Sequence, residues 1–177
     1  MSKVARWLWL VYRNVILGKE WPKARFFNTG AFNGVEMRIK VSRPWTVGPD
    51  QYLYVCAPGV SPFAFVQSHP YCIAWWENGS DGSLETVSLL IQPLRGFSSQ
   101  VLRATKRATW MPVAIEGPYG SSTDTSAFHL LVLFGSGIGI AALLPIIKQA
   151  LEVRKPALSP LQRILLVWSV EESGGST

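Results

Sequence analysis

Three glycines at alternate positions are the residues of this 177-residue chain whose spacing most directly indicates chemistry. Gly135, Gly137 and Gly139 lie within residues 130–147, a run without a charged side chain. A glycine turn that leads into a helix exposes backbone N–H groups, and with the helix dipole these favour an anion such as pyrophosphate. The candidate phosphate-binding residues are therefore Gly135, Ser136, Gly137, Ile138 and Gly139.

The flanks of this loop predict a βαβ unit. Residues 130–147 approach the ~20 apolar residues of a membrane span, but each glycine inside a helix costs ~1 kcal/mol relative to alanine. Residues 129–134 and 163–170 are short apolar runs of the kind that strands buried on both faces show. Between them, apolar residues recur at spacings of three and four, as in an amphipathic helix. A membrane span and a purely structural turn are the alternatives.

The loop departs from the dinucleotide fingerprint G-x-G-x-x-G/A, because Ile140 takes its last position. The acid that would bind a ribose would stand at the end of the second strand, where Glu171 and Glu172 lie. A solvated terminus is the other interpretation of these two glutamates.

Composition limits the classes of function. A chain with 48% hydrophobic and 16% charged residues is globular. Cys56 and Cys72 form neither a disulfide framework nor a metal-binding spacing, and His69 and His129 are too far apart in the sequence to indicate a zinc site. The net charge of +6 suits anionic cofactors or a phospholipid surface, and no nucleic-acid motif accompanies it. We therefore predict no metal site and no nucleic-acid partner.

Residues 25–119 carry the pattern of an antiparallel β-barrel or sandwich. Residues 35–41 alternate apolar and charged side chains, and further strands are expected at 51–56, 71–76, 86–91 and 111–116. Asn78-Gly-Ser-Asp-Gly82 has the composition of a hairpin loop. Trp75 and Trp76 should point to opposite faces of a strand, so at least one belongs to the core. Ser98 or Ser99 is expected to cap one helix, with Val101 and Leu102 on one face.

The first 17 residues mix lysine and arginine with tryptophan and tyrosine. This mixture suits a membrane interface, where aromatic rings lie among headgroups and cations meet anionic lipids. A first segment that packs on the barrel core is an equal alternative.

Four ordered motifs carry a resemblance to a known family: SHPYCIAWW, IQPLRGFSSQVL, IEGPYG and LFGSGIGIAALLPIIKQ. Together they resemble the ferredoxin-reductase-type flavoprotein module and, more narrowly, the cytoplasmic half of fungal ferric reductases, relatives of the NADPH oxidases. The resemblance implies a Greek-key FAD-binding β-barrel followed by a partial Rossmann-like α/β domain. It divides the chain into a membrane-proximal basic and aromatic segment (1–24), the barrel (25–120) and a C-terminally truncated NAD(P)-binding domain (121–177).

The resemblance also implies which residues bind the cofactors. His69-Pro70-Tyr71-Cys72 is similar to the family's His-Pro-Phe-Thr, in which the aromatic ring packs on the flavin and the hydroxyl bonds near its reactive nitrogen. Cys72 departs from this pattern, since a thiol is a weaker hydrogen-bond donor, and His69 has a structural role as its alternative. Gln51 and Tyr52 resemble a Gly-Gln-Tyr strand beside the flavin, and residues 95–99 a glycine turn before a helix. The FAD-binding residues so implied are Gln51, Tyr52, His69, Pro70, Tyr71, Cys72, Arg95, Gly96, Phe97, Ser98 and Ser99.

By resemblance, the full-length protein is an NADPH-dependent ferric-chelate reductase at the cytoplasmic face of a membrane, the plasma membrane being expected. Its cofactors are FAD and NADPH, and haem belongs only to a transmembrane partner domain outside this chain. Residues 1–24 would touch the membrane surface, and no residue is expected to act as acid, base or nucleophile. The alternatives are an NADPH oxidase-type or flavin reductase module, and an FAD-binding fragment without NADPH-driven turnover. A further alternative is a basic barrel that binds nucleic acid or membrane through Trp75 and Trp76.

Overall fold

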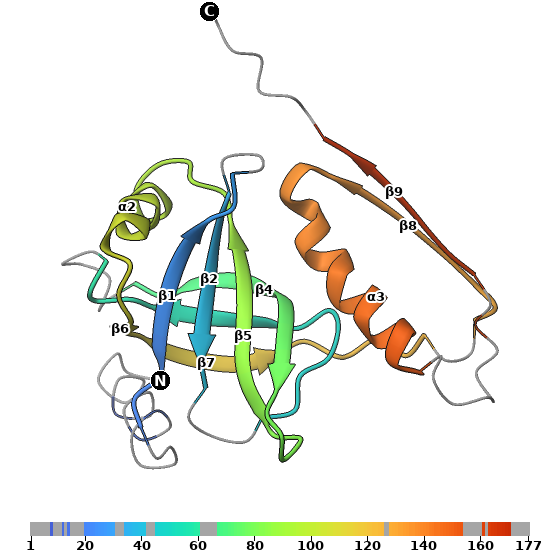
Figure 1. The fold of residues 1–177 in the computed structure, drawn as a ribbon, viewed down its shortest axis with the longest axis horizontal. Coiled ribbons are helices and arrows are strands. Elements are labelled where there is room, and N and C mark those ends of the chain that lie inside the picture. Colours follow the sequence, from blue (N-terminus) through green and yellow to red (C-terminus); the bar gives the residue numbers. More distant parts are fainter. Residues whose placement is uncertain are drawn as a thin grey trace, which may run out of the picture.

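The computed structural model describes residues 8, 12, 14, 20–30, 34–41, 45–60, 67–125, 128–153, 161 and 163–170. They form a curled antiparallel sheet and, beside it, a parallel βαβ unit (Figure 1). Glu171, Glu172 and most of the N-terminal segment lie outside the described residues.

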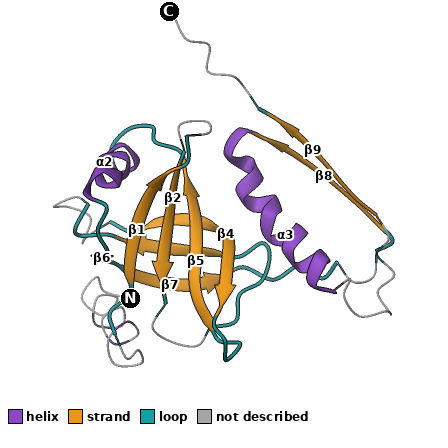
Figure 2. Ribbon diagram, viewed as in Figure 1, coloured by secondary structure: helices purple, strands orange, loops and turns teal. Residues whose placement is uncertain are grey.

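The antiparallel sheet has seven strands in the order β6-β1-β2-β5-β4-β3-β7. The strands are β1 (Lys23–Asn28), β2 (Val35–Lys40), β3 (Tyr52–Cys56), β4 (His69–Asn78), β5 (Leu84–Ile91), β6 (Met111–Pro112) and β7 (Ala114–Tyr119). The outermost strands β6 and β7 are separated only by Val113, so one stretch of chain supplies both edges. The sheet consequently curls into a half-barrel (Figure 2).

The strands expected at 35–41, 51–56, 71–76 and 86–91 are confirmed as β2 to β5, whereas the one expected at 111–116 is divided into β6 and β7. The β4–β5 hairpin turns at residues 79–83, where Gly82 has a φ of 78°. Alternation along β2 places Met37 and Ile39 in the core.

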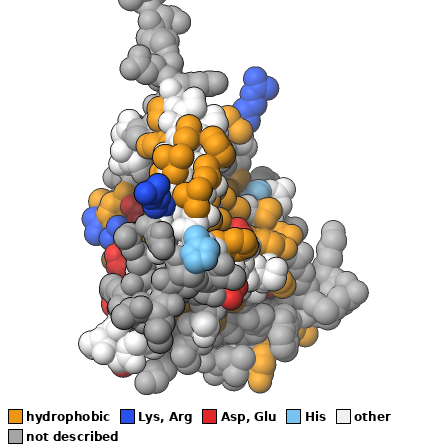
Figure 3. Space-filling model, turned by 90° about the vertical axis from the view of Figure 1, so that its right-hand side faces the viewer, with side chains coloured by type: hydrophobic (Ala, Val, Ile, Leu, Met, Phe, Trp, Pro, Cys, Tyr) orange, Lys and Arg blue, Asp and Glu red, His pale blue; other side chains and the backbone are white. Residues whose placement is uncertain are grey.

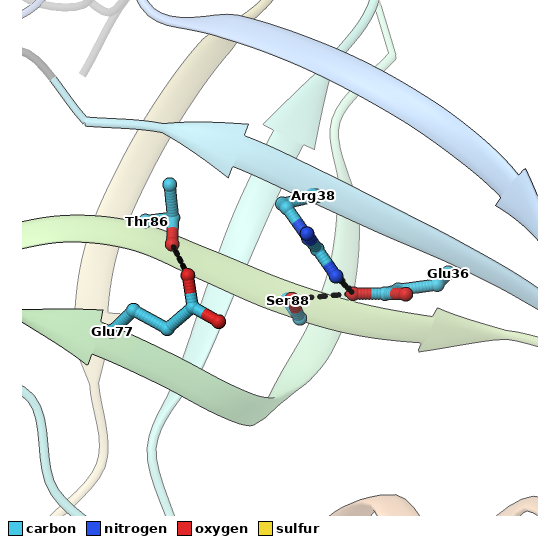
Figure 4. A network of polar contacts seen from close by, with 5 residues as sticks. All are labelled: Glu36, Arg38, Glu77, Thr86 and Ser88. Atoms are coloured by element: carbon cyan, nitrogen blue, oxygen red, sulfur yellow. Dashed lines mark hydrogen bonds and ion pairs between the residues drawn. The ribbon is translucent and has the colours of Figure 1, made fainter.

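The outer face of these strands carries a polar network (Figure 4). Arg38 Nη2 lies 3.1 Å from Glu36 Oε1, and the hydroxyl of Ser88 donates to the same oxygen at 2.7 Å. Thr86 donates to Glu77 Oε2 at 3.1 Å. Polar pairing therefore occupies the outer side of β2, β5 and β4, while their apolar side chains fill the half-barrel.

The core is built from β-branched and long aliphatic side chains of the strands, joined by α2 (Phe97–Ala104), through Phe97 and Val101. Trp76 is 5% exposed and Trp75 is 38% exposed, as expected of adjacent strand positions. At Asn14 the N-terminal segment packs on β7, because its side chain donates to the Ile115 carbonyl (3.0 Å) and accepts from the Ile115 N–H (3.1 Å).

The expected serine cap of α2 is wrong. The residue before the helix is Gly96, with φ 66° and ψ −128°, and no side chain caps the helix. Ser98 and Ser99 already lie in the first turn, where their hydroxyls donate to the carbonyls of Arg95 (3.2 Å) and Gly96 (2.8 Å). Glycine adopts this positive φ without a steric penalty from a Cβ atom. Gly96 therefore occupies the N-cap position, and both serines lie inside the helix.

The predicted βαβ unit is confirmed. β8 (Leu130–Ser136), the short 3-10 turn η3 (Gly137–Gly139), α3 (Ile140–Val153) and β9 (Arg163–Ser169) follow one another, and β8 pairs with β9 in parallel. A Cβ on Gly135 would lie 2.8 Å from Leu143 Cδ1, so a glycine here permits close packing of helix on strand. None of the described helices has the length and apolar character needed to cross a membrane.

One face of the parallel strand pair is exposed, as expected of two strands covered by a single helix, although their apolar runs resemble strands buried on both faces. Phe134 is 72% exposed and Leu165 52% exposed, and hydrophobic side chains gather on this side of the molecule (Figure 3). The reason is that α3 lies between the half-barrel and the strand pair (Figure 1), while no other described segment covers the pair's far face.

Candidate cofactor-binding site

A stack of two rings joins the His69–Cys72 motif to the Arg95–Ser99 motif, although His69 and Phe97 are 28 positions apart in the sequence. The imidazole of His69, at the start of β4, lies parallel to the ring of Phe97, the first residue of α2, with 4.2 Å between centroids and 9° between planes. His69 Nε2 is buried and has no hydrogen-bond partner among the described residues. Burial lowers the pKa of His69 from its usual 6.5, so the ring is neutral at pH 7.

The start of α2 is arranged to receive an anion. Within this fully described helix, no side chain caps the N-terminus and the first turn contains no acid. Its first N–H groups therefore have no intrahelical acceptor. A Cβ added at Gly96 would meet no atom within 4 Å, which leaves the backbone approachable, and the exposed Arg95 stands next to it. Donors, dipole and cation all favour a phosphate here.

β4 divides the first motif between two faces of the sheet. His69 and Tyr71 pair with Val55 and Leu53, both fully buried, so these four residues share the inner face. Burial raises the pKa of Tyr71 to about 12, so its phenol stays neutral at physiological pH. Tyr71 thus presents a half-buried, uncharged aromatic plane beside His69.

The outer face carries an aromatic group that motif matching missed in part. Cys72, with an exposed thiol, lies opposite Tyr52. The ring of Tyr52 lies 5.7 Å from those of Tyr54 and Tyr119, centroid to centroid. Only Tyr52 is among the predicted site residues. Tyr54 could have been predicted as well, because it follows Tyr52 by two residues on the same strand, and such residues point to one face.

The hydrogen-bond pattern directs the main-chain groups of Cys72 away from β3. The N–H of Ile73 donates to the Gln51 carbonyl at 2.9 Å, so these two residues form a hydrogen-bonded antiparallel pair. In the next pair, Cys72 and Tyr52, the main-chain groups point away from each other. The N–H and C=O of Cys72 therefore point to the side of β4 on which β5 begins to pair, at Ile73.

Gln51 holds the neighbouring loops together. Its Oε1 accepts from the Gly48 N–H at 2.9 Å, and its Nε2 donates to the Gly120 carbonyl at 3.5 Å. Thr123 donates to the carboxylate of Asp50 between the same two loops. These contacts support the β3 end of the site, which carries Tyr52.

The glycine loop lies apart from the other predicted residues. In Figure 1, α2 and the turn between β8 and α3 stand on different sides of the half-barrel. Gly137 has a φ of 48°, and its carbonyl accepts from Trp168 Nε1 at 3.0 Å. Ser136 and Gly139 are exposed. The structure therefore brings the two predicted FAD motifs together and leaves the predicted nucleotide loop on the separate βαβ unit.

Comparison with known proteins identifies the family. A family profile described as an FAD-binding domain matches residues 21–123. The chain is 32% identical over 157 residues to Ferric reductase transmembrane component 5 of Saccharomyces cerevisiae, which covers 88% of this chain and 22% of that protein. It is 27% identical over 145 residues to NADPH oxidase 1 of Rattus norvegicus, covering 79% of this chain and 24% of that protein.

Among solved structures, the fold is similar to that of phthalate dioxygenase reductase, described as a modular structure for electron transfer from pyridine nucleotides to [2Fe-2S]. The TM-score is 0.59 at 16% identity, over 85% of this chain and 44% of that chain. The chain spans less than a quarter of the length of the yeast ferric reductase component and of the rat NADPH oxidase.

Proposed function

Since the chain belongs to the family of FAD-binding domains, we propose that it is the flavin-binding module of a membrane ferric-chelate reductase that uses NADPH. Its similarity to the yeast ferric reductase component supports this assignment. In the full-length protein the module would stand at the cytoplasmic face of the plasma membrane, next to a haem-bearing transmembrane domain. Residues 25–120 would form the FAD-binding Greek-key barrel and residues 121–177 part of a Rossmann-like NAD(P)-binding domain. Residues 1–24 would touch the membrane surface.

The observation that carries the proposal is the junction of His69 with Phe97 at the start of α2. It places a buried, unpartnered imidazole nitrogen beside an uncapped helix N-terminus and an exposed arginine. These groups fit the pyrophosphate of FAD, which needs several donors and positive potential. The residues that would hold it are His69, Arg95, Gly96, Ser98 and Ser99.

Other residues of β4 and β3 fit the flavin ring. Tyr71 offers a neutral aromatic plane, and Cys72 offers an exposed thiol at the start of the β4–β5 pairing. Tyr52 shares a face with Cys72, and Pro70 lies on the same face, opposite Tyr54. FAD held by these residues would supply the redox chemistry, which is hydride acceptance and single-electron release. The chain's own residues bind, orient and shield it, and none needs to move a proton.

The NADPH site would be the loop from Gly135 to Gly139. Its glycines leave the backbone approachable at Gly137 and Gly139, where an added Cβ would meet no atom within 4 Å. The start of α3 directly follows, so its N–H groups and dipole favour phosphate there.

The test is an anaerobic flavin assay on the purified chain. FAD is added, unbound flavin is removed, the visible spectrum is recorded and NADPH is then supplied. Retained flavin absorbance that bleaches supports the complete proposal. Loss of all flavin from a chain that melts cooperatively would refute the FAD assignment.

A second candidate function is an FAD-binding module that NADPH does not reduce by itself. The specific observation in its favour is the exposed apolar face of β8 and β9, where Phe134 is 72% exposed. A nucleotide-binding sheet is normally covered on both faces. Retained flavin that dithionite bleaches and NADPH does not would select this candidate. An NADPH oxidase-type module differs only in its final acceptor and is supported by the similarity to the rat oxidase.

A further inference from the structure

Lys148 of α3 connects the βαβ unit to the half-barrel. Its Nζ lies 4.6 Å from the ring centroid of Trp75 and 5.0 Å from that of Trp76, both on β4. It also lies 3.3 Å from Glu152 Oε1, one turn further along α3, and the lysine side chain is only 16% exposed. An ammonium withdrawn from water in this way interacts more strongly with aromatic rings than an exposed one does.

Both indoles lie close to this one cation although they come from adjacent positions of β4. Adjacent residues of a regular strand point to opposite faces, and Trp76 is buried while Trp75 is partly exposed. Both ring centroids nevertheless lie within 5.0 Å of Lys148 Nζ. The lysine therefore contacts the strand at two consecutive positions.

Lys148 lies far enough from the start of α3 that a small tilt of the helix about this residue would move the glycine loop. Lys148 follows Ile140, the first residue of α3, by eight positions, which is about 12 Å along a helix axis. A tilt of roughly 5° about Lys148 would displace the start of α3, and with it the glycine loop, by about 1 Å. Displacements of about 1 Å between reacting groups can change rates by about 100-fold. The strand that carries the two indoles also begins with His69 and Tyr71.

We propose that Lys148 is a positioning residue, held between Trp75 and Trp76, that sets the angle between α3 and β4 and so the place of the glycine loop relative to the flavin-binding strand. Its consequence for NADPH rests on the proposed function. The orientation itself does not, because it depends only on contacts within this chain.

The first test measures orientation directly. Spin labels are attached at Ser80→Cys on the β4–β5 hairpin and at Ala142→Cys near the start of α3, both exposed positions, in a Cys72→Ser background. The label-to-label distance distribution should be narrow with Lys148, broader or shifted in K148Q, and restored in K148R, which keeps the cation. K106Q, which removes an exposed lysine of the half-barrel, is the matched control and should leave the distribution unchanged.

An identical distribution in K148Q, or a broad one in the chain that retains Lys148, would overturn the inference. FAD retention is measured on unlabelled chains that keep Cys72, and it should be equal with Lys148, K148Q and K148R, since Lys148 is not among the FAD-binding residues. Where NADPH bleaches the flavin, K148Q should raise the half-saturating NADPH concentration or slow bleaching by about 10-fold or more, and K148R should recover it. An unlabelled chain that keeps Cys72 and Lys148 and retains no flavin would refute the proposed function, while the distance distributions would still decide the role of Lys148.

Discussion

Phe97→Leu tests whether the ring stack preorganises the FAD site. Phe97 is buried at the first position of α2, and leucine keeps an apolar side chain there while it removes the parallel contact with His69. An aromatic pair contributes about 0.5–1.5 kcal/mol beyond its buried area. A near-isosteric apolar exchange in a core costs up to about 1.5 kcal/mol. The free energy of unfolding should therefore fall by about 0.5–3 kcal/mol.

The consequence for FAD follows from the same contact. If the stack holds His69 Nε2 in its binding position, its loss should raise the FAD dissociation constant by about two- to twelve-fold. Urea unfolding measures the change in stability, and quenching of flavin fluorescence measures the dissociation constant. Val101→Ala, a fully buried position on the same helix that does not contact His69 in a ring pair, is the control. It should lower stability by about 1.6 kcal/mol and leave FAD affinity unchanged.

A double-mutant cycle with His69→Ala separates the stack from general destabilisation. The two substitutions should be coupled by about 0.5–1.5 kcal/mol in unfolding free energy. Additivity within about 0.3 kcal/mol would mean that the rings touch without mutual stabilisation. An unchanged FAD dissociation constant in Phe97→Leu would refute the preorganisation argument.

The remaining predictions concern a turn, a buried imidazole, a thiol and an apolar face. Gly120→Ala should destabilise the chain by about 1–3 kcal/mol in urea unfolding, because φ is 95° and the new Cβ would lie 2.6 Å from the Asp50 carbonyl oxygen; an unchanged midpoint would contradict this. Burial lowers the pKa of His69 in the folded chain, so as pH falls through about 6.5 this imidazole is protonated in the unfolded chain before it is in the folded one. The melting temperature should thus fall below this pH, and H69Q should show a smaller fall than the unsubstituted chain. The exposed Cys72 should react with a thiol reagent while the buried second cysteine does not, and FAD should slow that reaction; equal rates with and without FAD would place the flavin elsewhere. Phe134→Lys should reduce binding of an apolar dye and self-association measured by sedimentation, with little change in melting temperature, because the side chain is already 72% exposed.

The strands and the βαβ unit were predictable because their signals are local. Alternation over residues 35–41 and the apolar runs around Gly135–Gly139 each specify one element through the period of its side chains. Their predicted bounds agree with β2, β8, α3 and β9 to within a few residues. The family was likewise readable from four short motifs, and the FAD-binding profile over residues 21–123 agrees.

Features that depend on distant partners were not predictable in this way. The start of α2 was expected at a serine, but Gly96 takes the left-handed φ that begins it. The apolar runs of β8 and β9 alone do not show which face is covered, because burial depends on another layer, and no described segment covers the far face. Tyr119 joins Tyr52 only because β7 pairs with β3.

The candidate site shows the same division. Resemblance to short family motifs, each contiguous in the chain, predicts that His69, Tyr71 and the Gly96 turn bind FAD. Only the tertiary structure decided that His69 stacks on Phe97, that Cys72 faces the other side of the sheet, and that the glycine loop stands apart from both. Periodicity fixes which side of an element is apolar, whereas the contact between two elements depends on strand order, register and a bulge, which are set by packing across the whole sheet.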